Sequence, residues 1–432
     1  MVDQKAKNNL LVGAVEVDIT PPVGVALAGY GARTKNSIGV HDPLKAQALY
    51  IQSGADKLLI FTCDIIGIEL GITMQIREMI AQELEISPSN ILISCSHTHS
   101  GPQGYLPNEP LHMSLKDDEL VRMTQRKFLG AAIWAISQKE PANLAFGEQQ
   151  LTGVGKNRNS PDAGPQDTQL NVLRFNNSQG EPIAVLFNYG CHPTVMGHDN
   201  LLITADFPGA ARQGLKAHFP NCVFMFANGA CGDVSTRFTR REQTFAEVER
   251  HGLILTGGVL EAMMKSEPVE VDHVEAECVE VQLPQRELPS AEEIDATLIG
   301  LQKKLEGLKE KSAPHGEIRK VFTQLEGAQA QLELANLELE TSFFHTQLQF
   351  LQIGPIFIAA IPGEPFSQTV LEVKSMCSPV KTLVISHAND SKGYFPDRGT
   401  IEQGTYEALI SPYDWRVPDL IFRATVNHCP KE

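Results

Sequence analysis

Residues 58–94 contain the pattern that most constrains how this chain can fold. The run LLIFTCDII at residues 58–66 is mostly apolar and of strand length, and residues 71–85 have the spacing of an amphipathic helix. Residues 91–94 are again apolar and strand-like. A strand, a helix and a strand in this order favour a parallel or mixed sheet with helices on its faces. The sequence therefore predicts an α/β protein of the mixed α+β kind, with mixed β-sheets flanked by helices.

The same alternation continues along the rest of the chain. Further strands are predicted at residues 10–18, 183–189, 223–227, 355–361 and 382–386. Further helices are predicted at residues 119–138 and from about Pro208 to His218. Pro208 is expected at the first helical position, where its missing N–H is tolerated. We expect a single domain over residues 1–432.

Residues 290–341 differ in kind from the rest. Ser290 and Glu293 are spaced as a capping box at the start of a helix. The apolar residues that follow are spaced alternately by four and three: Ile294, Leu298, Leu301, Leu305 and Leu308. After a break at residues 314–316, a second apolar stripe comprises Ile318, Phe322, Leu325, Leu332 and Leu339. The pattern predicts an antiparallel helical hairpin, inserted in the domain because strand character resumes at residue 347. The hairpin packs either on the body of the protein or on a second subunit, which would make a homodimer.

Charge and apolar content exclude several classes of protein. The 36 basic and 52 acidic residues give a net charge of −16 without a basic block, so a nucleic-acid partner is not expected. The hydrophobic fraction of 42% is enough for a buried core. The longest uncharged apolar stretch, at residues 351–363, is interrupted by Gly354 and two prolines and falls short of the roughly 20 residues that a bilayer requires. We expect no transmembrane segment.

The N-terminus and the cysteines bear on the compartment. The first nine residues are polar, and the short apolar run after them contains Gly13 and Glu16, so no secretion signal is predicted. The eight cysteines are scattered without a CxxC pair, which is typical of reduced and mostly buried thiols. We therefore expect a cytoplasmic protein.

Two histidines directly follow the predicted strand at residues 91–94. The motif SHTHSGP at residues 96–102 places His97 and His99 two residues apart, on one face of an extended backbone. Neutral imidazole is a preferred ligand of zinc. Taken alone, this pattern is as typical of two histidines at a strand end as of a metal site.

Four other predicted strands also end in side chains that can do chemistry. They are followed by His192, by Asp233 with Ser235, by Glu364 and by Tyr394. Sites in open α/β sheets lie outside the carboxyl ends of the strands, so we expect these side chains to meet. Two histidines, a carboxylate and a fourth ligand make a catalytic zinc site, whereas Ca²⁺ and Mg²⁺ prefer oxygen ligands. The convergence predicts a metallohydrolase.

Three alternatives stay open on the residues alone. A serine hydrolase would use Ser235 with a histidine base and an orienting acid, although its context GDVS lacks the GxSxG elbow. A metal-binding module without turnover would keep the ligands and lack hydrolysis. A barrel-type amidohydrolase would need a metal-bridging lysine and a late strand-end aspartate.

Several motifs occur in a fixed order over about residues 10–410. They are GAVEVDITP (13–21), GVHDPLKAQA (39–48), SHTHSGP (96–102), NRNSP (157–161), NYGCH (188–192), GDVS (232–235), PGE (362–364) and the stretch at residues 389–407. This order resembles the catalytic N-terminal domain of the neutral/alkaline non-lysosomal ceramidase family. The chain looks like one of its short, bacterial-type members, which carry no C-terminal β-sandwich domain.

The resemblance implies a site and a reaction. One Zn²⁺ per chain would be held by His97, His192, Glu364 and Tyr394. The residues implied around it are His99 for proton transfer, Arg158 for orienting the substrate, Tyr406 lining the scissile amide, and Ser235, which the family pattern assigns as nucleophile. Because metal-activated water makes a second nucleophile unnecessary, we expect Ser235 to position the substrate. The small-molecule partner would be an N-acyl amide, such as a ceramide-like lipid of sphingolipid metabolism.

The sequence also departs from the family pattern. Thr236 follows GDVS where a proline is usual, and FPDRG follows Tyr394 in place of a Val-Thr-Thr stretch. Ile401 stands where a tyrosine is expected. We therefore predict a zinc-dependent hydrolase that cleaves the linear amide of an N-acyl compound by metal-activated water. The acyl chain and the amine of the substrate are left open.

Overall fold

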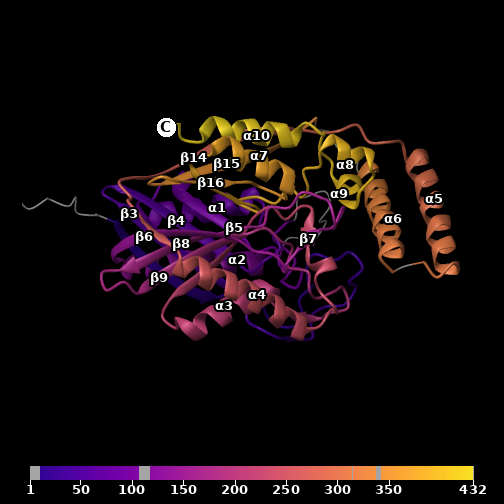
Figure 1. The fold of residues 1–432 in the computed structure, drawn as a ribbon. Helices are drawn as coiled ribbons and strands as arrows, with labels where there is room; N and C mark the ends of the chain where they lie inside the picture. The colour runs from indigo at the N-terminus through magenta and orange to yellow at the C-terminus, as the bar shows by residue number, and fades with distance from the viewer. Residues whose placement is uncertain (1–9, 107–116, 314, 337–341, 432) are drawn as a thin grey trace, which may run out of the picture.

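The computed structural model describes residues 10–106, 117–313, 315–336 and 342–431. Its largest element is a mixed nine-stranded sheet (Figure 1). In order across the sheet its strands are β11 (Val223–Asn228), β9 (Pro182–Tyr189), β8 (Gln169–Asn177), β6 (Glu140–Gln150), β1 (Leu10–Asp18), β3 (Lys45–Ser53), β4 (Asp56–Cys63) and β5 (Ile91–Cys95), with β13 (Glu267–Val269) beside β6. The β4–β5 and β9–β11 pairs are parallel and the others are antiparallel.

A second, four-stranded sheet lies against the first. Its strands in order are β14 (Val274–Pro284), β15 (Phe343–Ile353), β16 (Ile356–Ala360) and β17 (Lys381–Ile385), of which only the β16–β17 pair is parallel. Alternate residues of a strand point to opposite faces, so β4 can serve two cores. Leu58 and Ile60 pack against β15 and β16, whereas Leu59 and Phe61 pack against helices. The two sheets therefore share a buried apolar layer.

Helices cover the outer faces of both sheets. On the large sheet lie α1 (Leu70–Leu84), α2 (Asp118–Ser137), α3 (Asp206–His218) and α4 (Phe245–Met264). On the small sheet lie α7 (Ser367–Cys377) and α10 (Val417–His428). Figure 1 shows the resulting order of helices, small sheet, large sheet and helices. The predicted fold class is confirmed.

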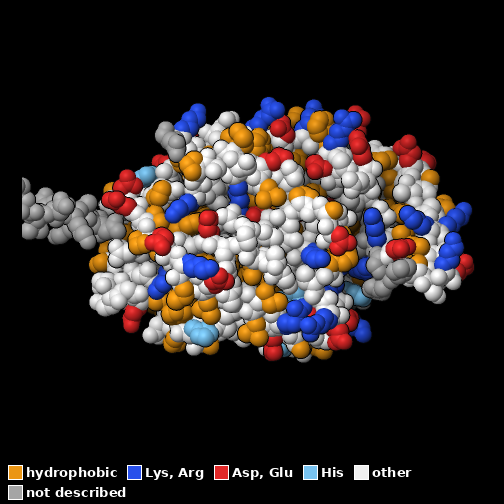
Figure 2. Space-filling view, viewed as in Figure 1, with side chains coloured by type: hydrophobic (Ala, Val, Ile, Leu, Met, Phe, Trp, Pro, Cys, Tyr) orange, Lys and Arg blue, Asp and Glu red, His pale blue; other side chains and the backbone are white. Residues whose placement is uncertain are grey.

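Several short elements complete the described part of the chain. They are β2 (Gly39–Val40), β7 (Lys156–Asn157), β10 (Leu202–Ile203), β12 (Val234–Ser235), the 3₁₀ turns η1 (Pro88–Asn90) and η2 (Thr236–Phe238), and the helices α8 (Arg398–Glu402) and α9 (Tyr406–Ile410). Among the described helices none is long and apolar enough to cross a membrane. On the face in Figure 2, acidic and basic side chains are interspersed, so neither sign dominates it.

The helical hairpin is present and projects from the body. It consists of α5 (Ala291–Glu310) and α6 (His315–Ala335), and the Ser290–Glu293 capping box is formed. Figure 1 places α6 between α5 and the pair α8–α9. Neighbours therefore cover α6 on two sides, and its buried residues include Val321, Ala328 and Leu334. The residues of the predicted apolar stripe that the structure describes are only partly buried. Leu339 of that stripe lies outside the described residues.

Two local predictions are wrong. The first is the position of Pro208, because α3 begins at Asp206 and the proline is its third residue. The second is the extended backbone through SHTHSGP, because β5 ends at Cys95 and His97 has φ +69°. The His97 amide donates to Ile65 O at 3.0 Å, which stabilises this turn. All eight cysteines are free thiols and seven are buried, as predicted.

Candidate metal centre

The functional end of the fold forms where the two edges of the large sheet approach each other. Asn228, the last residue of β11, donates through Nδ2 to Ser96 O, just beyond β5, at 3.1 Å. The segment after β17 crosses the same place, where Ser386 N donates to Asn228 O at 2.8 Å. The ends of β5, β9, β11, β16 and β17 are thus brought together by both sheets. The sequence suggested that these strand ends meet along one edge of a single open sheet, and this explanation is not correct.

Four side chains from separate strand ends converge at this place. His192 Nε2 lies 2.9 Å from Glu364 Oε2 and 3.2 Å from the Tyr394 hydroxyl. His97 Nε2 lies 3.7 Å from Glu364 Oε1. All four side chains are buried. The residues predicted as ligands therefore do meet.

The two histidines are held so that their Nε2 lone pairs face the centre. His97 Nδ1 donates to Ile66 O at 2.6 Å, and His192 Nδ1 donates to Cys231 O at 2.5 Å. A backbone acceptor at Nδ1 fixes the neutral tautomer whose Nε2 is free to coordinate a metal. Burial, followed by the charge of Arg158, holds the pKa of His192 well below its usual value, which favours the neutral ring.

This arrangement fits a cation on physical grounds. A neutral His192 presents a lone pair at Nε2 to an oxygen of Glu364, and two facing lone pairs in a buried site repel each other. A positive ion between them removes the repulsion. His97, His99 and His192 form one group of donors within 4.8 Å of one another, and Glu364 joins two further groups. Imidazole nitrogen with carboxylate oxygen is a donor set typical of zinc.

His99 lies beside the four converging side chains. Its Nε2 is 3.2 Å from His97 Nε2, and its ring contacts Tyr30 with a centroid distance of 5.0 Å. Gly29 leaves room for this ring, because a Cβ there would lie 2.4 Å from it. Gly29 also has φ +95°, a conformation that side chains rarely adopt. The Gly-Tyr pair therefore shapes the position of His99.

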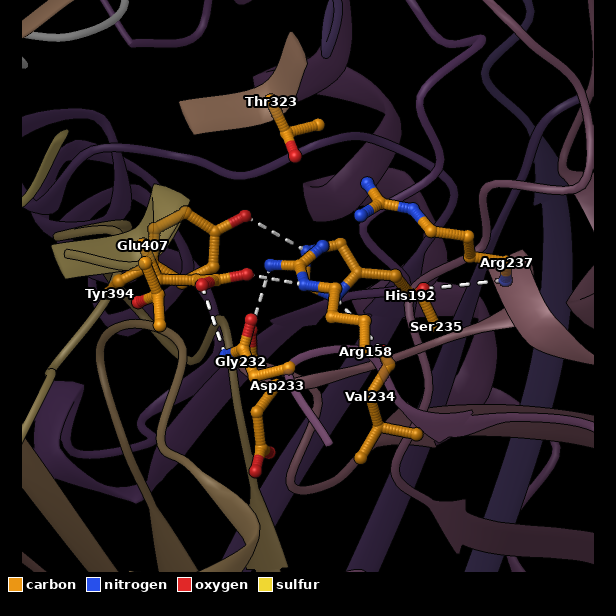
Figure 3. A network of polar contacts seen from close by, with 12 residues as sticks. Arg158, His192, Gly232, Asp233, Val234, Ser235, Arg237, Thr323, Tyr394 and Glu407 are labelled. Carbon is orange, nitrogen blue, oxygen red and sulfur yellow. Dashed lines mark hydrogen bonds and ion pairs between the residues drawn. The ribbon is translucent and has the colours of Figure 1, made fainter. Parts of the chain in front are cut away.

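Arg158 lies against Tyr394 and is fixed by two partners (Figure 3). Its Nε is 2.6 Å from Glu407 Oε1, and its Nη2 donates to Gly232 O at 2.8 Å. Both side chains of the Arg158–Glu407 pair are buried. Tyr406 is adjacent, with its ring 6.3 Å from that of Tyr394, and burial raises the pKa of Tyr406 to about 12. Its phenol therefore stays a hydrogen-bond donor at neutral pH.

Ser235 lies at the site without the partner that a nucleophile needs. Its backbone pairs with that of His192, and its Oγ accepts from Arg237 N at 3.4 Å. Within the described part of the chain, no histidine forms a hydrogen bond with this hydroxyl. A serine nucleophile requires a base within hydrogen-bond reach. The geometry therefore favours positioning by Ser235, and its role stays a prediction.

Asp233 is the predicted strand-end residue that turns away from the centre (Figure 3). Its Oδ1 accepts from Ser367 N and Oγ at 2.9 Å, and its Oδ2 accepts from Asn157 Nδ2 at 2.7 Å. These bonds join β7, the GDVS turn and the start of α7. Asp233 therefore supports the site without facing it.

Sequence reasoning gave no role to two residues that the fold brings to the site, His387 and Glu407. His387 stacks on His97 at 3.7 Å, and its Nε2 is 3.4 Å from Cys231 Sγ. Glu407 fixes Arg158 as described. The signal for His387 was its position directly after a predicted strand. Glu407 lies on the short helix α9 and ends the family stretch at residues 389–407, which gave it no role of its own.

Comparison with solved structures gives the same architecture. The crystal structure of neutral ceramidase from Pseudomonas aeruginosa superposes with a TM-score of 0.79 over 99% of this chain and 76% of that one, at 17% identity. A ceramidase complexed with C2 gives a TM-score of 0.78. At this identity the likeness establishes the fold alone.

Sequence comparison identifies the same group of proteins. Neutral ceramidase of Pseudomonas aeruginosa is 25% identical over 224 residues, 46% of this chain and 32% of that protein. Neutral ceramidase 2 of Arabidopsis thaliana is 26% identical over 231 residues, 49% and 30% of the two chains, and neutral ceramidase of Mycobacterium tuberculosis is 25% identical over 270 residues, 52% and 40%. The matches thus span about a third of the length of these relatives.

The family comparison covers a larger share of this chain. The sequence profile described as "Neutral/alkaline non-lysosomal ceramidase, N-terminal" matches residues 10–249. That region includes SHTHSGP, NRNSP, NYGCH and GDVS. Because the match extends over more than half of the residues, this chain belongs to the neutral/alkaline non-lysosomal ceramidase family.

Proposed function

We propose that this protein is a metal-dependent hydrolase that cleaves the linear amide bond of an N-acyl compound. Membership of the ceramidase family supports amide hydrolysis as the reaction. The observation that carries the metal is the approach of His192 Nε2 and Glu364 Oε2 to 2.9 Å inside a buried centre. Two facing acceptors at that distance call for a cation.

His97, His192, Glu364 and Tyr394 would hold one divalent ion per chain, and the donor set favours zinc. When bound, such an ion supplies Lewis acidity, which polarises a carbonyl oxygen and acidifies water. The backbone acceptors at Ile66 and Cys231 orient the two imidazoles before any ligand arrives. This preorganisation keeps the donor atoms in place within the buried centre.

The remaining side chains bind the substrate and handle its charge and proton. Arg158, locked by Glu407 and Gly232 O, presents a fixed positive charge to the oxygen that becomes negative as the carbonyl is attacked. Tyr406 can donate its hydroxyl proton to the same amide group. His99, at the edge of the centre, can pass a proton through Nε2 to the departing amine. Ser235 would position the substrate next to His192.

The proposal is tested by metal content and turnover together. Purified protein is analysed for metal by mass spectrometry and assayed on N-acyl sphingosines and simpler N-acyl amides, with and without a chelator. We expect one divalent ion per chain, loss of hydrolysis with chelator, and recovery on adding zinc. His97→Ala should lose both metal and turnover, whereas His273→Ala, at a partly exposed position outside the centre, should lose neither.

Three outcomes would contradict the proposal. Full activity in a metal-free sample excludes a metal-dependent reaction. Chelator-insensitive hydrolysis with fluorophosphonate labelling of Ser235 would support a serine hydrolase instead. One bound zinc with no hydrolysis of any amide would support a metal-binding module.

A further inference from the structure

Helix α6 of the hairpin packs next to the tyrosines of the metal centre. Gln324 Nε2 donates to Gly404 O at 3.0 Å, just before α9. The backbone of α6 comes so close at Gly327 that a Cβ there would lie 3.1 Å from Leu409 and 3.3 Å from Tyr406. Ala330 packs against the cluster that contains Tyr394. The inserted hairpin therefore borders the site itself.

One face of α6 is directed toward this place, and most of it is polar. Arg319, Thr323, Glu326 and Ala330 are spaced by four, three and four residues, which places them on one side of the helix. Thr323 is buried, and Figure 3 shows it facing the space above Tyr394 and beside the end of Arg237. The border of the site formed by α6 is thus polar for most of its length.

Arg237 approaches the same space from the other side. It lies in η2, two residues after Ser235, and is partly buried. Figure 3 shows its guanidinium directed toward the space between Thr323 and the Arg158–His192 pair. Among the described residues, no carboxylate lies within the 4.0 Å of an ion pair from the guanidinium of Arg237 or Arg319. No hydrogen bond from either guanidinium is formed within the same part of the chain.

Neighbouring arginines donate to oxygens of the protein, whereas the Arg237 and Arg319 guanidiniums do not among the described residues; that of Arg319 lies over the Phe322 ring, 5.0 Å from its centroid. Arg158 pairs with Glu407. Arg33 donates to the carbonyls of Ala28 and His99 at 2.8 and 2.9 Å. Arg240 donates to Thr194 O at 2.6 Å. The structure therefore uses those three arginines to hold the walls of the site together.

The fold gains little from keeping Arg237 where it is. Burial, followed by the charges of Arg158 and Arg319, lowers the pKa of Arg237 to about 10, so it remains charged at neutral pH. A guanidinium that loses water without gaining a partner is destabilising. Glu326 is the nearby carboxylate of α6, and burial raises its pKa despite the charges of Arg319 and Arg237. An anion bound between η2 and α6 would give the Arg237 guanidinium the partner that it lacks among the described residues.

Resting on the proposed function, we propose that Arg237 and Arg319 bind an anionic group of the substrate, a carboxylate or a phosphate, close to the scissile amide. The acyl part of such an amide is a hydrocarbon, so the charged group belongs to the amine part. The substrates are then N-acyl amino acids or N-acyl phosphoethanolamines. Arginine binds both anions through a planar fork of N–H donors.

The test compares substrates that share an acyl chain and an amide and differ in charge. They are N-dodecanoylglycine, N-dodecanoylphosphoethanolamine and the neutral N-dodecanoylethanolamine. We expect the wild-type protein to have a higher kcat/KM for one of the anionic amides, which identifies the anion. Arg237→Gln should lower that kcat/KM by about 10- to 100-fold, as expected for a lost charge-assisted hydrogen bond. The same change should alter kcat/KM for the ethanolamide by less than about twofold.

Two further variants separate anion binding from a general effect of charge. Arg241→Gln removes the same charge from an exposed position four residues away and should leave all three kcat/KM values unchanged. Arg237→Lys keeps the charge and should recover part of the selectivity for the anionic amide. Arg319→Gln, on the facing helix, should reduce the same selectivity as Arg237→Gln.

The outcomes distinguish this inference from the proposed function. The inference is overturned if the protein prefers the ethanolamide or a ceramide and Arg237→Gln does not change this selectivity. The proposed amide hydrolysis would then still stand. If no amide is turned over, the proposed function fails. Calorimetric binding of N-dodecanoylglycine and N-dodecanoylphosphoethanolamine then decides the anion site: binding at least tenfold weaker in Arg237→Gln supports it, and equal or absent binding overturns it.

Discussion

His192 Nε2 and Glu364 Oε2 face each other at 2.9 Å although they follow strands of different sheets, β9 and β16. Because His192 Nδ1 already donates to Cys231 O, its Nε2 has no proton to share with the carboxylate. The two side chains therefore form half of the proposed cation site. This relationship makes the metal proposal testable with a change that keeps shape and removes charge.

Glu364→Gln should weaken zinc binding strongly, because it removes the charge of a proposed ligand. The loss of affinity should exceed the about 10- to 100-fold that the loss of an outer-shell partner costs. The zinc affinity is measured by competition with a chromophoric chelator. Saturating zinc should raise the melting temperature of the wild-type protein and leave that of the variant nearly unchanged. Glu372→Gln, an exposed position on α7, is the matched control. Unchanged zinc affinity in Glu364→Gln would contradict the ligand assignment.

Glu407→Gln should reduce both stability and turnover, because it leaves the buried Arg158 charge without its partner. Removing one member of a buried pair typically costs about 3–5 kcal/mol. Urea unfolding measures the loss of stability, and kcat/KM measures the loss of a fixed cation at the site. The double variant Arg158→Gln/Glu407→Gln should be less destabilised than the sum of the single variants. Additive losses would show that the two side chains do not act as a pair.

Gly29→Ala should lower activity by displacing His99. The added Cβ would lie 2.4 Å from the imidazole, and φ +95° adds backbone strain of about 1–3 kcal/mol. Gly24→Ala separates the two effects, because Gly24 has φ +102° with no atom within 4 Å of the added Cβ. Thermal unfolding should show a loss of stability in both variants. Only Gly29→Ala should lose kcat/KM, and equal kinetic losses would exclude a specific effect on His99.

Asp206 should make stability depend on pH. Burial raises the pKa of this carboxyl to about 6 from a usual value of 3.8. A folded-state pKa above the unfolded one means that the stabilising contribution is fully present below pH 3.8 and is lost as the pH rises through 6. The shift corresponds to about 3 kcal/mol of unfolding free energy across that window. Its neighbours at the carboxylate are the Met196 and Phe207 amides.

Asp206→Asn removes this titration while keeping a residue that tolerates the φ of +56°. The free energy of unfolding is measured in urea between pH 4.5 and 7.5 for both proteins. The free energy of unfolding of the variant should rise relative to that of the wild-type protein as the pH rises. Parallel curves would show that the carboxyl does not titrate in this range.

Local structure was readable from local pattern. The strand at residues 10–18 is formed over exactly those residues, and the helix predicted at 71–85 is found at Leu70–Leu84. Both follow from apolar periodicity and from breakers at their ends, which act over a few residues. The capping box at Ser290 is equally local. The homodimer through the hairpin and the cytoplasmic location stay predictions.

The side chains that converge at the candidate site were selected from the sequence, but the reasons for their meeting could not be. His97, His192, Glu364 and Tyr394 each follow a strand, and the family motifs marked them. Their meeting depends on the approach of β11 to β5 and on the crossing of the segment after β17. Those contacts join segments far apart in the chain, so no local spacing could indicate them. The φ of +69° at His97 accompanies the hydrogen bond from its amide to Ile65 O, which also joins residues far apart in the chain.

Neighbouring residues and motif order were enough to indicate most of the helices and strands, the family, and the chemical types of the side chains at the strand ends. Long-range packing set which face of α6 borders the candidate metal centre. It also placed Arg237 and Arg319 there, and no carboxylate in the described part of the chain pairs with either guanidinium. Packing of the hairpin on α9 sets that choice, since a helix with partly buried residues all round can present more than one face to its neighbours.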